Sequence, residues 1–267
     1  MGELIVSDLK VALKKGAVEL VKGLSFTLQG GSSLVLLGQS GCGKTMTCRA
    51  AMGLLDPRLF RTGGRILFDG TELLSLPERK RRDYYGKRIA FIPQNPMTAL
   101  DPSVKIGSQM IESIRLHTDL RGAQCRERAA LSLAKAGLKD TDRIYRSRPD
   151  MLSGGMMQRV LIAMALSTDA ELIIADEPTT ALDVVHRNET VDLFVRLRQA
   201  GAAVLFVTHD FAAALRMGGN VLIMKDGAVI EHGQTSAVYD HPKSDYTKAL
   251  VRASALSKGG NAARADC

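Results

Sequence analysis

The chain has 267 residues, of which 45% are apolar and 24% charged, a composition typical of globular proteins. Its apolar runs stay far below the ~20 residues of a membrane-spanning helix, and the opening MGELIVSDLK lacks the basic region of a secretion signal, so we expect a cytoplasmic protein. The formal net charge of +8 would suit nucleic acid, an anionic membrane face or nucleotide phosphates, or it is simply a solvated basic surface.

A phosphate-binding loop is predicted at GQSGCGKT, between an apolar strand at 33–38 and a helical run. Its three glycines let successive backbone N–H groups point inward, and the helix start adds partial positive charge. We expect Lys44 to reach the β and γ phosphates of a nucleoside triphosphate and the Thr45 hydroxyl to ligate Mg²⁺. The predicted nucleotide-binding residues are Gly38, Gln39, Ser40, Gly41, Cys42, Gly43, Lys44 and Thr45.

Two Asp-Gly turns, in FDGTEL (68–73) and KDGAVIEHG (225–233), predict small antiparallel strands beside the main sheet. The densest basic run, RKRRDYYGKR (79–88), contains two tyrosines. One such cluster, without further interleaving of aromatic and basic residues, is weak support for nucleic-acid binding, and we expect no nucleic-acid partner.

An inserted helical lobe is predicted in the middle of the chain, because residues 100–150 have apolar residues at helical spacing and no strand signal. With its flanks this lobe takes residues 96–159. Residues 1–95 and 160–240 then form a catalytic core with an antiparallel β lobe. Residues 241–267 form a C-terminal helix and a tail, SKGGNAARADC, whose small polar residues predict disorder. The whole chain, 1–267, is expected to be one domain.

The stretch LSGGMMQR, residues 152–159, predicts a second anion site at a helix start. Ser153 suits the N-cap, and Gly154 and Gly155 leave the first-turn N–H groups bare, at a cost of about 1 kcal/mol each in helix propensity. This second anion site lies beyond the helical lobe, so it need not share the pocket of the phosphate loop in the same chain. If two copies of the chain face each other, the site of one copy can complete the phosphate-loop pocket of the other. The alternative is a glycine-rich entry chosen for close packing, which leaves the serine unexplained.

Two carboxylates end an apolar strand at ELIIADEPTT, where ligands collect in open parallel sheets. We expect Asp176 to hold the Mg²⁺ shell and Glu177 to act as general base toward a water at the γ phosphate, unless the pair is a plain solvated turn. A third apolar strand follows at 202–209. The fold class predicted is therefore α/β, with a mostly parallel sheet of the P-loop NTPase (RecA-like) type, an antiparallel β lobe and an inserted helical lobe.

The order of these motifs resembles the ATP-binding subunits of ABC transporters, and the resemblance covers nearly the whole chain. GQSGCGKT is similar to the Walker A motif, LSGGMMQR to the signature, and LIIADE to Walker B. IPQNP with Gln94 resembles the Q-loop, ALD with Asp183 the D-loop, and VTHD with His209 the switch histidine.

The resemblance implies a head-to-tail dimer, in which each ATP lies between the Walker A motif of one subunit and Ser153, Gly154, Gly155 and Met156 of the other. It implies that Gln94 couples the Mg²⁺ site to the helical lobe and that His209 contacts the γ phosphate. The catalytic set is then Glu177, His209 and Gln94, and the Mg²⁺ set is Thr45, Gln94 and Asp176. ATP and Mg²⁺ are the implied cofactors.

Within the family, QNPMTALDPSVKIGSQM and HPKSDYTKALV are similar to the importers of dipeptides, oligopeptides and nickel. Met156 stands where the signature usually has Gln, as in nickel import subunits. The resemblance therefore implies an ATPase that powers nickel or metal-chelate import from the cytoplasmic face of the inner membrane; a dipeptide or oligopeptide cargo is the alternative. Its partners would be a second ATP-binding subunit, identical or paralogous, two membrane permeases and, indirectly, an extracytoplasmic solute-binding protein.

Two other functions stay open at this point: a soluble ABC ATPase acting on nucleic acid or ribosomes, and a non-hydrolytic binding module. The first usually has a long coiled coil or two ATPase modules, which this sequence lacks, and the second does not need Glu177 and His209. The N-terminal strand offers no aromatic residue before Phe26 to stack on adenine. We expect Val11, Leu13 or Val18 to pack there and nucleotide binding to be weakly base-selective.

The four cysteines are scattered without a C-x-x-C pair, which predicts free thiols rather than disulfides or a zinc or iron-sulfur site. They are Cys42, Cys48, Cys125 and Cys267, and the last stands alone in the C-terminal tail.

Overall fold

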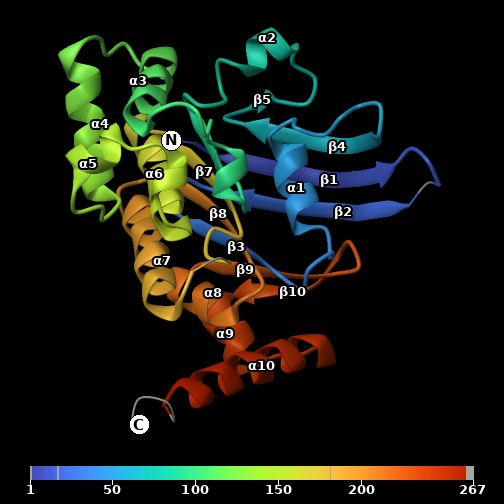
Figure 1. Ribbon diagram of the computed structural model, residues 1–267. Helices are drawn as coiled ribbons and strands as arrows, with labels where there is room; N and C mark the ends of the chain where they lie inside the picture. Colours follow the sequence, from blue (N-terminus) through green and yellow to red (C-terminus); the bar gives the residue numbers. More distant parts are fainter. Residues whose placement is uncertain (1, 17, 181, 263–267) are drawn as a thin grey trace.

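The computed structural model describes residues 2–16, 18–180 and 182–262, and its larger sheet carries the phosphate loop (Figure 1). The strand order is β10-β9-β3-β8-β7-β6, in which β9 to β6 run parallel and β10 is an antiparallel edge. The predicted strands at 33–38, 171–176 and 202–209 are β3, β7 and β8. The bounds are β3 (Ser33–Leu37), β6 (Ile89–Ile92), β7 (Leu172–Asp176), β8 (Ala203–Thr208), β9 (Asn220–Lys225) and β10 (Ala228–Gln234).

The smaller sheet is antiparallel, with the order β2-β1-β4-β5. Its strands are β1 (Leu4–Leu13), β2 (Glu19–Leu28), β4 (Phe60–Phe68) and β5 (Thr71–Glu72). Both predicted Asp-Gly turns are present, one between β4 and β5 and one between β9 and β10. Asp226 (φ 50°) and Gly227 (φ 83°) are left-handed, as the two-residue turn of a tight hairpin requires.

The helices divide into those inserted between β6 and β7 and those elsewhere in the chain (Figure 1). The inserted helices are η1 (Pro96–Thr98), α3 (Ile106–His117), α4 (Ala123–Lys135), α5 (Thr141–Arg146), η2 (Pro149–Met151) and α6 (Gly154–Ser167). The others are α1 (Lys44–Ala51), α2 (Glu78–Arg81), α7 (Val184–Gln199), α8 (Phe211–Met217), α9 (Thr235–Asp240) and α10 (Asp245–Ala262). Helix α6 crosses the predicted lobe boundary at residue 160, so it connects the helical lobe directly to the core.

Two apolar cores lie on opposite faces of the larger sheet, because side chains alternate along each strand. On β3, Val35 and Leu37 join the cluster shared with α6, α7 and α8, whereas Leu34 and Leu36 join the cluster under α1 and the smaller sheet. All of these side chains are buried. The sheet is therefore covered on both faces, which explains why its parallel strands read as continuous apolar runs.

The C-terminal segment begins with helix α10, which is described as far as Ala262. The disorder expected for the tail stays a prediction. Residues 263–267, and with them Cys267, lie outside the described residues.

Two further sequence expectations concern the described part of the chain as a whole. Cys42, Cys48 and Cys125 are buried free thiols, as predicted. Among the described residues, no helix combines the length and the apolar character needed to cross a bilayer.

Candidate active site

The phosphate loop connects β3 to α1 and depends on close backbone approaches. A Cβ atom at Gly38 would collide with the carbonyl oxygen of Met224, and one at Gly43 with that of Leu20. Gly43 is the N-cap of α1 with φ 104°, in the left-handed region, and no side chain of the described residues caps the helix there. The first N–H groups of α1 are thus left for a ligand, as an anion site at a helix start requires.

Lys44 is buried at the base of this loop and already satisfied within the chain. Its Nζ donates to the carbonyl oxygens of Gly38 at 2.7 Å and Gln39 at 3.0 Å. The same ammonium lies 3.4 Å from Glu177 Oε1. A buried charge is costly unless it is paired and hydrogen-bonded, so these contacts give Lys44 a stable position before any nucleotide is bound.

Thr45 and Asp176 meet across the sheet edge. The Thr45 hydroxyl donates to Asp176 Oδ1 at 3.0 Å, which joins the start of α1 to the end of β7. Burial raises the pKa of Asp176, with the Thr45 bond acting in the opposite direction. Burial also raises the pKa of the nearby Cys42 and Cys48 thiols, so both are unreactive core residues rather than nucleophiles.

Glu177 is the centre of the polar network. Its Oε2 accepts from Thr180 Oγ1 at 2.8 Å and Gln94 Nε2 at 3.3 Å, and lies 3.1 Å from His209 Nδ1. The structure therefore brings the three predicted catalytic residues, Gln94, Glu177 and His209, to one carboxylate. Thr180 was not anticipated, although a hydroxyl three residues beyond a carboxylate at a turn is a recognisable pattern.

The backbone and the charge of Glu177 are both unusual. Its φ of 46° is left-handed, a conformation that costs a non-glycine residue about 1 kcal/mol or more, and its N–H donates to Val207 O at 3.0 Å. The hydrogen bond from His209 lowers the pKa of Glu177 to about 2, supported by Thr180 and Lys44. The same bond raises the pKa of His209. The pair is a hydrogen-bonded ion pair whenever His209 is protonated.

The loop and the carboxylates line a pocket of about 220 Å³. Its lining residues are Leu20, Ser40, Gly41, Gly43, Lys44, Thr45, Met46, Gln94 and Glu177. Of the three residues expected to pack on adenine, Val11 is fully buried in the core beneath the smaller sheet, so that expectation is wrong for Val11. Leu20 lines the pocket instead, and strand alternation explains why: its neighbour Val21 points into the core.

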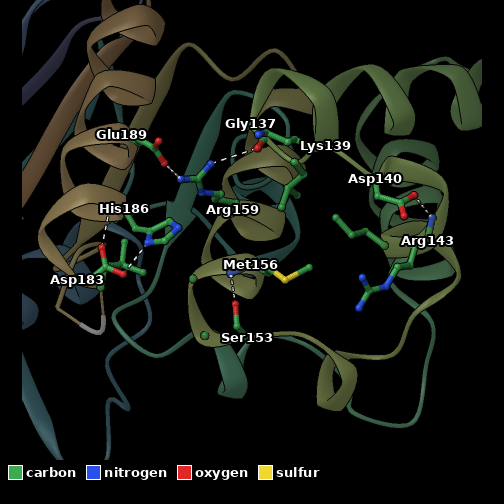
Figure 2. A pocket seen from close by; sticks show the side chains of 15 residues that line it. Gly137, Lys139, Asp140, Arg143, Ser153, Met156, Arg159, Asp183, His186 and Glu189 are labelled. Carbon is green, nitrogen blue, oxygen red and sulfur yellow. Dashed lines mark hydrogen bonds and ion pairs between the residues drawn. The ribbon is translucent and has the colours of Figure 1, made fainter.

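The signature residues line a second pocket of about 740 Å³ (Figure 2). Ser153 is the N-cap of α6, as predicted, and its hydroxyl accepts from the Met156 N–H at 3.3 Å. The side chain of Met156 extends from α6 toward the side of the pocket where Arg143 lies (Figure 2). Pocket residues also come from the turn before α5 and from the start of α7.

The two signature glycines differ in what surrounds them. A Cβ atom at Gly155 would lie 3.1 Å from Leu182 Cδ2, so packing within the chain favours glycine there. A Cβ atom at Gly154 would meet nothing within 4 Å among the described residues. Close packing thus accounts for Gly155 but leaves Gly154 unexplained, and Gly154 faces open space.

Helix α7 contributes the other wall of this pocket. Asp183 is the N-cap of α7, and its carboxylate accepts from the His186 N–H at 3.0 Å and contacts His186 Nδ1 at 2.6 Å. Arg159 of α6 forms an ion pair with Glu189 of α7 and donates to Gly137 O at 3.2 Å (Figure 2). Arg159 therefore fixes the signature helix against α7, a role that spacing alone did not reveal.

The signature pocket and the phosphate-loop pocket share no lining residue within the described chain. Ser153, Gly154, Gly155, Met156 and Asp183 are brought together on one surface, whereas the predicted catalytic and Mg²⁺ residues gather on the other. One copy of the chain therefore presents two separate pockets.

A comparison with protein-family models matches residues 21–180 to the model described as "ABC transporter". This chain belongs to the ABC transporter family. It is 42% identical over 233 residues to the metal-staphylopine import system ATP-binding protein CntD of Staphylococcus aureus, which covers 87% of this chain and 86% of that protein. It is 38% identical over 251 residues to the oligopeptide transport ATP-binding protein OppD of Salmonella typhimurium, over 93% of this chain and 75% of that protein.

The fold of this ABC transporter chain is also that of solved ATP-binding cassettes. One of them, a dimeric cassette in a post-hydrolysis state bound to ADP and Pi, superimposes with a TM-score of 0.78 at 26% identity, over 87% of this chain and 98% of that one. The predicted fold class and the resemblance to ABC ATP-binding subunits are thus confirmed, and the chain is an ATP-binding ATPase.

The basic run at 79–88 has a structural explanation in this ABC transporter subunit. The Tyr84 hydroxyl contacts Thr71 Oγ1 at 3.1 Å, and the Tyr85 hydroxyl donates to Ala51 O at 3.3 Å. Arg88 forms ion pairs with Glu171 and Asp69. The two tyrosines and Arg88 therefore join the smaller sheet to the core, whereas Arg79, Lys80, Arg82 and Lys87 are exposed.

Proposed function

We propose that the chain is the ATP-hydrolysing subunit of an importer, bound peripherally to the cytoplasmic face of the inner membrane. ATP binding closes a dimer of two such subunits, and hydrolysis reopens it. The observation that carries this proposal is the Glu177 carboxylate, held by Gln94, Thr180 and His209 beside Lys44. A chain that only bound nucleotide would not need a carboxylate fixed in this way next to the phosphate loop.

Glu177 is ionised but fully engaged in the ligand-free arrangement. Its pKa of about 2 makes it a weak base, in part because Lys44 lies against it. When the β and γ phosphates draw the Lys44 ammonium toward them, one stabilising charge leaves Glu177 and its pKa rises. Glu177 then accepts the proton of the attacking water more readily, while Gln94 and His209 keep the carboxylate oriented.

The residues expected to hold Mg²⁺ suit that ion. Mg²⁺ prefers oxygen ligands and is usually bound by one or two carboxylates together with substrate phosphates. The Thr45 hydroxyl and the Asp176 carboxylate are 3.0 Å apart beside the phosphate loop, and the described residues contain no cluster of three or more His, Cys, Asp and Glu for a metal. When bound, Mg²⁺ would neutralise charge on the phosphates; Thr45, Asp176 and Gln94 would hold it.

The second half-site supports a dimer in which each pocket is completed in trans. Ser153 and Gly154 are exposed at a helix start, and a Cβ atom at Gly154 would meet no described residue within 4 Å. The phosphates of a nucleotide on the neighbouring subunit would meet the bare N–H groups there. Asp183 at the start of α7 would reach the same interface. The neighbour is an identical or paralogous ATP-binding subunit.

For the cargo, we propose nickel or a metal chelate. The identity to the metal-staphylopine import ATPase, 42%, is higher than the 38% to the oligopeptide transport subunit, and Met156 agrees with this choice. Dipeptides or oligopeptides are the second candidate, supported by the identity to OppD. The complete importer would contain two permease subunits, and a solute-binding protein would deliver the cargo from outside.

Reconstitution tests both parts of the proposal. The chain is assembled with its permeases in proteoliposomes, and ATP hydrolysis is measured with the solute-binding protein loaded with a Ni²⁺ chelate or with a dipeptide. We expect the Ni²⁺ chelate to stimulate hydrolysis several-fold over the unloaded receptor. Stimulation by the dipeptide alone would replace the metal by the peptide cargo, and hydrolysis that responds only to added nucleic acid would reject the importer function.

A further inference from the structure

The C-terminal helix touches the phosphate loop directly. The Tyr246 hydroxyl, at the start of α10, accepts a hydrogen bond from the backbone N–H of Gln39 at 2.9 Å, although the two residues are 207 positions apart. Gln39 is the second residue of the loop, so a segment far from the catalytic motifs in sequence contacts the element that binds the phosphates.

This contact completes the bonding of one peptide group. The N–H of Gln39 and the C=O of Gly38 belong to the same peptide unit. Lys44 Nζ donates to that C=O at 2.7 Å, while Tyr246 accepts from the N–H on the opposite side. A peptide bonded at both ends is fixed in orientation, and each bond polarises the other. The orientation of this peptide determines where Lys44 rests before it turns to the nucleotide.

Tyr246 is itself held firmly. Lys225 Nζ lies over its ring, 5.4 Å from the centroid, at the β9–β10 turn. The buried carboxylate of Glu231 on β10 accepts from the backbone N–H groups of Lys243 at 2.8 Å and Ser244 at 3.1 Å. The base of α10 is thereby anchored to the larger sheet, which gives the hydroxyl a defined place against the loop.

The same turn supports the loop from a second side. The N–H of Gly227 donates to the carbonyl oxygen of Cys42 at 3.1 Å, and Gly227 O accepts from the Lys22 N–H at 2.8 Å. The β9–β10 turn and α10 therefore contact the loop at residues 42 and 39 respectively. The end of the chain and its last hairpin act on the loop together.

We propose that Tyr246 is a positioning residue of the phosphate loop: its hydroxyl fixes the Gly38–Gln39 peptide and thereby sets nucleotide affinity. This inference rests on the ATPase activity of the chain. Tyr246 contacts the phosphate loop through the Gln39 N–H and is not among the described residues that line the pocket, so it acts through the loop, on binding rather than on the chemical step.

Tyr246→Phe removes the hydroxyl and keeps the ring over which Lys225 lies. In the full-length protein we expect the KM for ATP to rise about three- to tenfold, the effect of one lost hydrogen bond, with kcat within twofold and Tm lowered by no more than about 2 to 4 °C. The matched control is Tyr239→Phe on α9, whose ring packs edge-to-face on Phe211 with centroids 5.4 Å apart. It should leave KM at the wild-type value.

A double substitution isolates the bond. Gln39→Pro removes the donor, because proline has no N–H. On that background Tyr246→Phe should change KM no further. A KM equal to wild type in Tyr246→Phe, an undiminished effect on the Gln39→Pro background, or a fall in Tm with a parallel loss of kcat would each overturn the proposal. Turnover by the wild type is measured alongside, so a failure of the ATPase function itself is distinguished from a failure of this inference.

Discussion

The phosphate-loop pocket and the signature pocket differ in how completely the chain satisfies them. In the first, Lys44, Asp176 and Glu177 are buried, and each has partners within the chain. In the second, Ser153 and Gly154 are exposed and face open space. Buried charges are costly without partners, so the charged side chains of the first pocket have to be paired within one subunit. The N–H groups of an exposed helix start are hydrated at little cost, so the second pocket is stable in one subunit before another surface binds to it.

The largest expected effect tests the phosphate-loop pocket. Glu177→Gln keeps the size of the side chain but removes the base, so turnover should fall by about 10²- to 10⁴-fold, whereas ATP binding is retained. ATP should also hold the variant as a stable dimer, because hydrolysis no longer reopens it. The measurements are steady-state hydrolysis, calorimetric ATP binding and light scattering with ATP.

The matched control is Glu171→Gln, next to the first residue of β7. Glu171 pairs with Arg88 at 2.6 Å, outside the pocket. This variant should hydrolyse ATP at close to the wild-type rate. Unaltered turnover in Glu177→Gln would remove the base assignment.

The next largest effect tests the signature pocket. Gly154→Ala adds a methyl group that meets none of the described residues within 4 Å and improves helix propensity by up to about 1 kcal/mol, so unfolding midpoints should stay equal or rise. Hydrolysis should nevertheless fall tenfold or more, because the methyl group enters the space reserved for the neighbour's nucleotide. Urea unfolding of the subunit and hydrolysis by the assembled transporter provide the two readouts.

Gly155→Ala serves as the comparison for Gly154→Ala. Its added methyl group would lie 3.1 Å from Leu182, so the gain in helix propensity is offset by packing within the subunit. If Gly154→Ala were fully active, the open space would have no functional meaning, and the division into two half-sites would be wrong.

A smaller effect concerns pH. The raised pKa of His209 means that its contribution to stability is fully present below pH 6.5 and is lost as pH rises through the folded-state pKa. The lowered pKa of Glu177 gives a contribution that is present above about pH 4.5 and lost as pH falls toward about 2. Both contributions are complete between these limits.

We therefore expect nucleotide-free wild type to lose more stability between pH 6 and pH 8.5 than His209→Gln does. Lys44 and Asp210 also act on His209 but are present in both proteins, so they cancel in the difference. Urea unfolding of both proteins at the two pH values measures the difference in the free energy of unfolding. Equal losses in the two proteins would show that the ion pair contributes nothing to folding.

The smallest effect is expected for the selectivity between adenine and guanine nucleotides. The described residues that line the phosphate-loop pocket include Leu20 and no aromatic side chain, so we expect the extra stacking term of about 0.5 to 1.5 kcal/mol to be missing. Affinities for ATP and GTP, measured by calorimetry, should agree within about threefold, which corresponds to less than 1 kcal/mol. A strong preference for ATP would mean that other groups of the protein recognise adenine.

What the sequence predicted well depends on short-range patterns. The phosphate loop, the acidic strand end at Asp176 and the Asp-Gly turns each need only a few adjacent residues, and each lies where the pattern placed it. The family resemblance predicted Gln94 and His209 as catalytic residues together with Glu177. The three lie close together because parallel strands bring their carboxyl ends to one edge of the sheet.

Contacts between distant segments were out of reach of these patterns. Arg159 bonds to Glu189 and Gly137, and Tyr246 reaches Gln39, through geometry that only the folded chain defines.

The position of β3 has a consequence for the synthesis of the protein. The neighbours of β3 are β8 and β9, and β8 begins at Ala203, roughly 165 residues after β3 ends. At about 5 to 20 residues per second, the apolar segment SLVLL and the loop that follows it leave the ribosome about 10 to 30 s before any strand can pair with them. During that interval both edges of β3 lack their strand partners, so we expect chains terminated before residue 203 to be prone to aggregate.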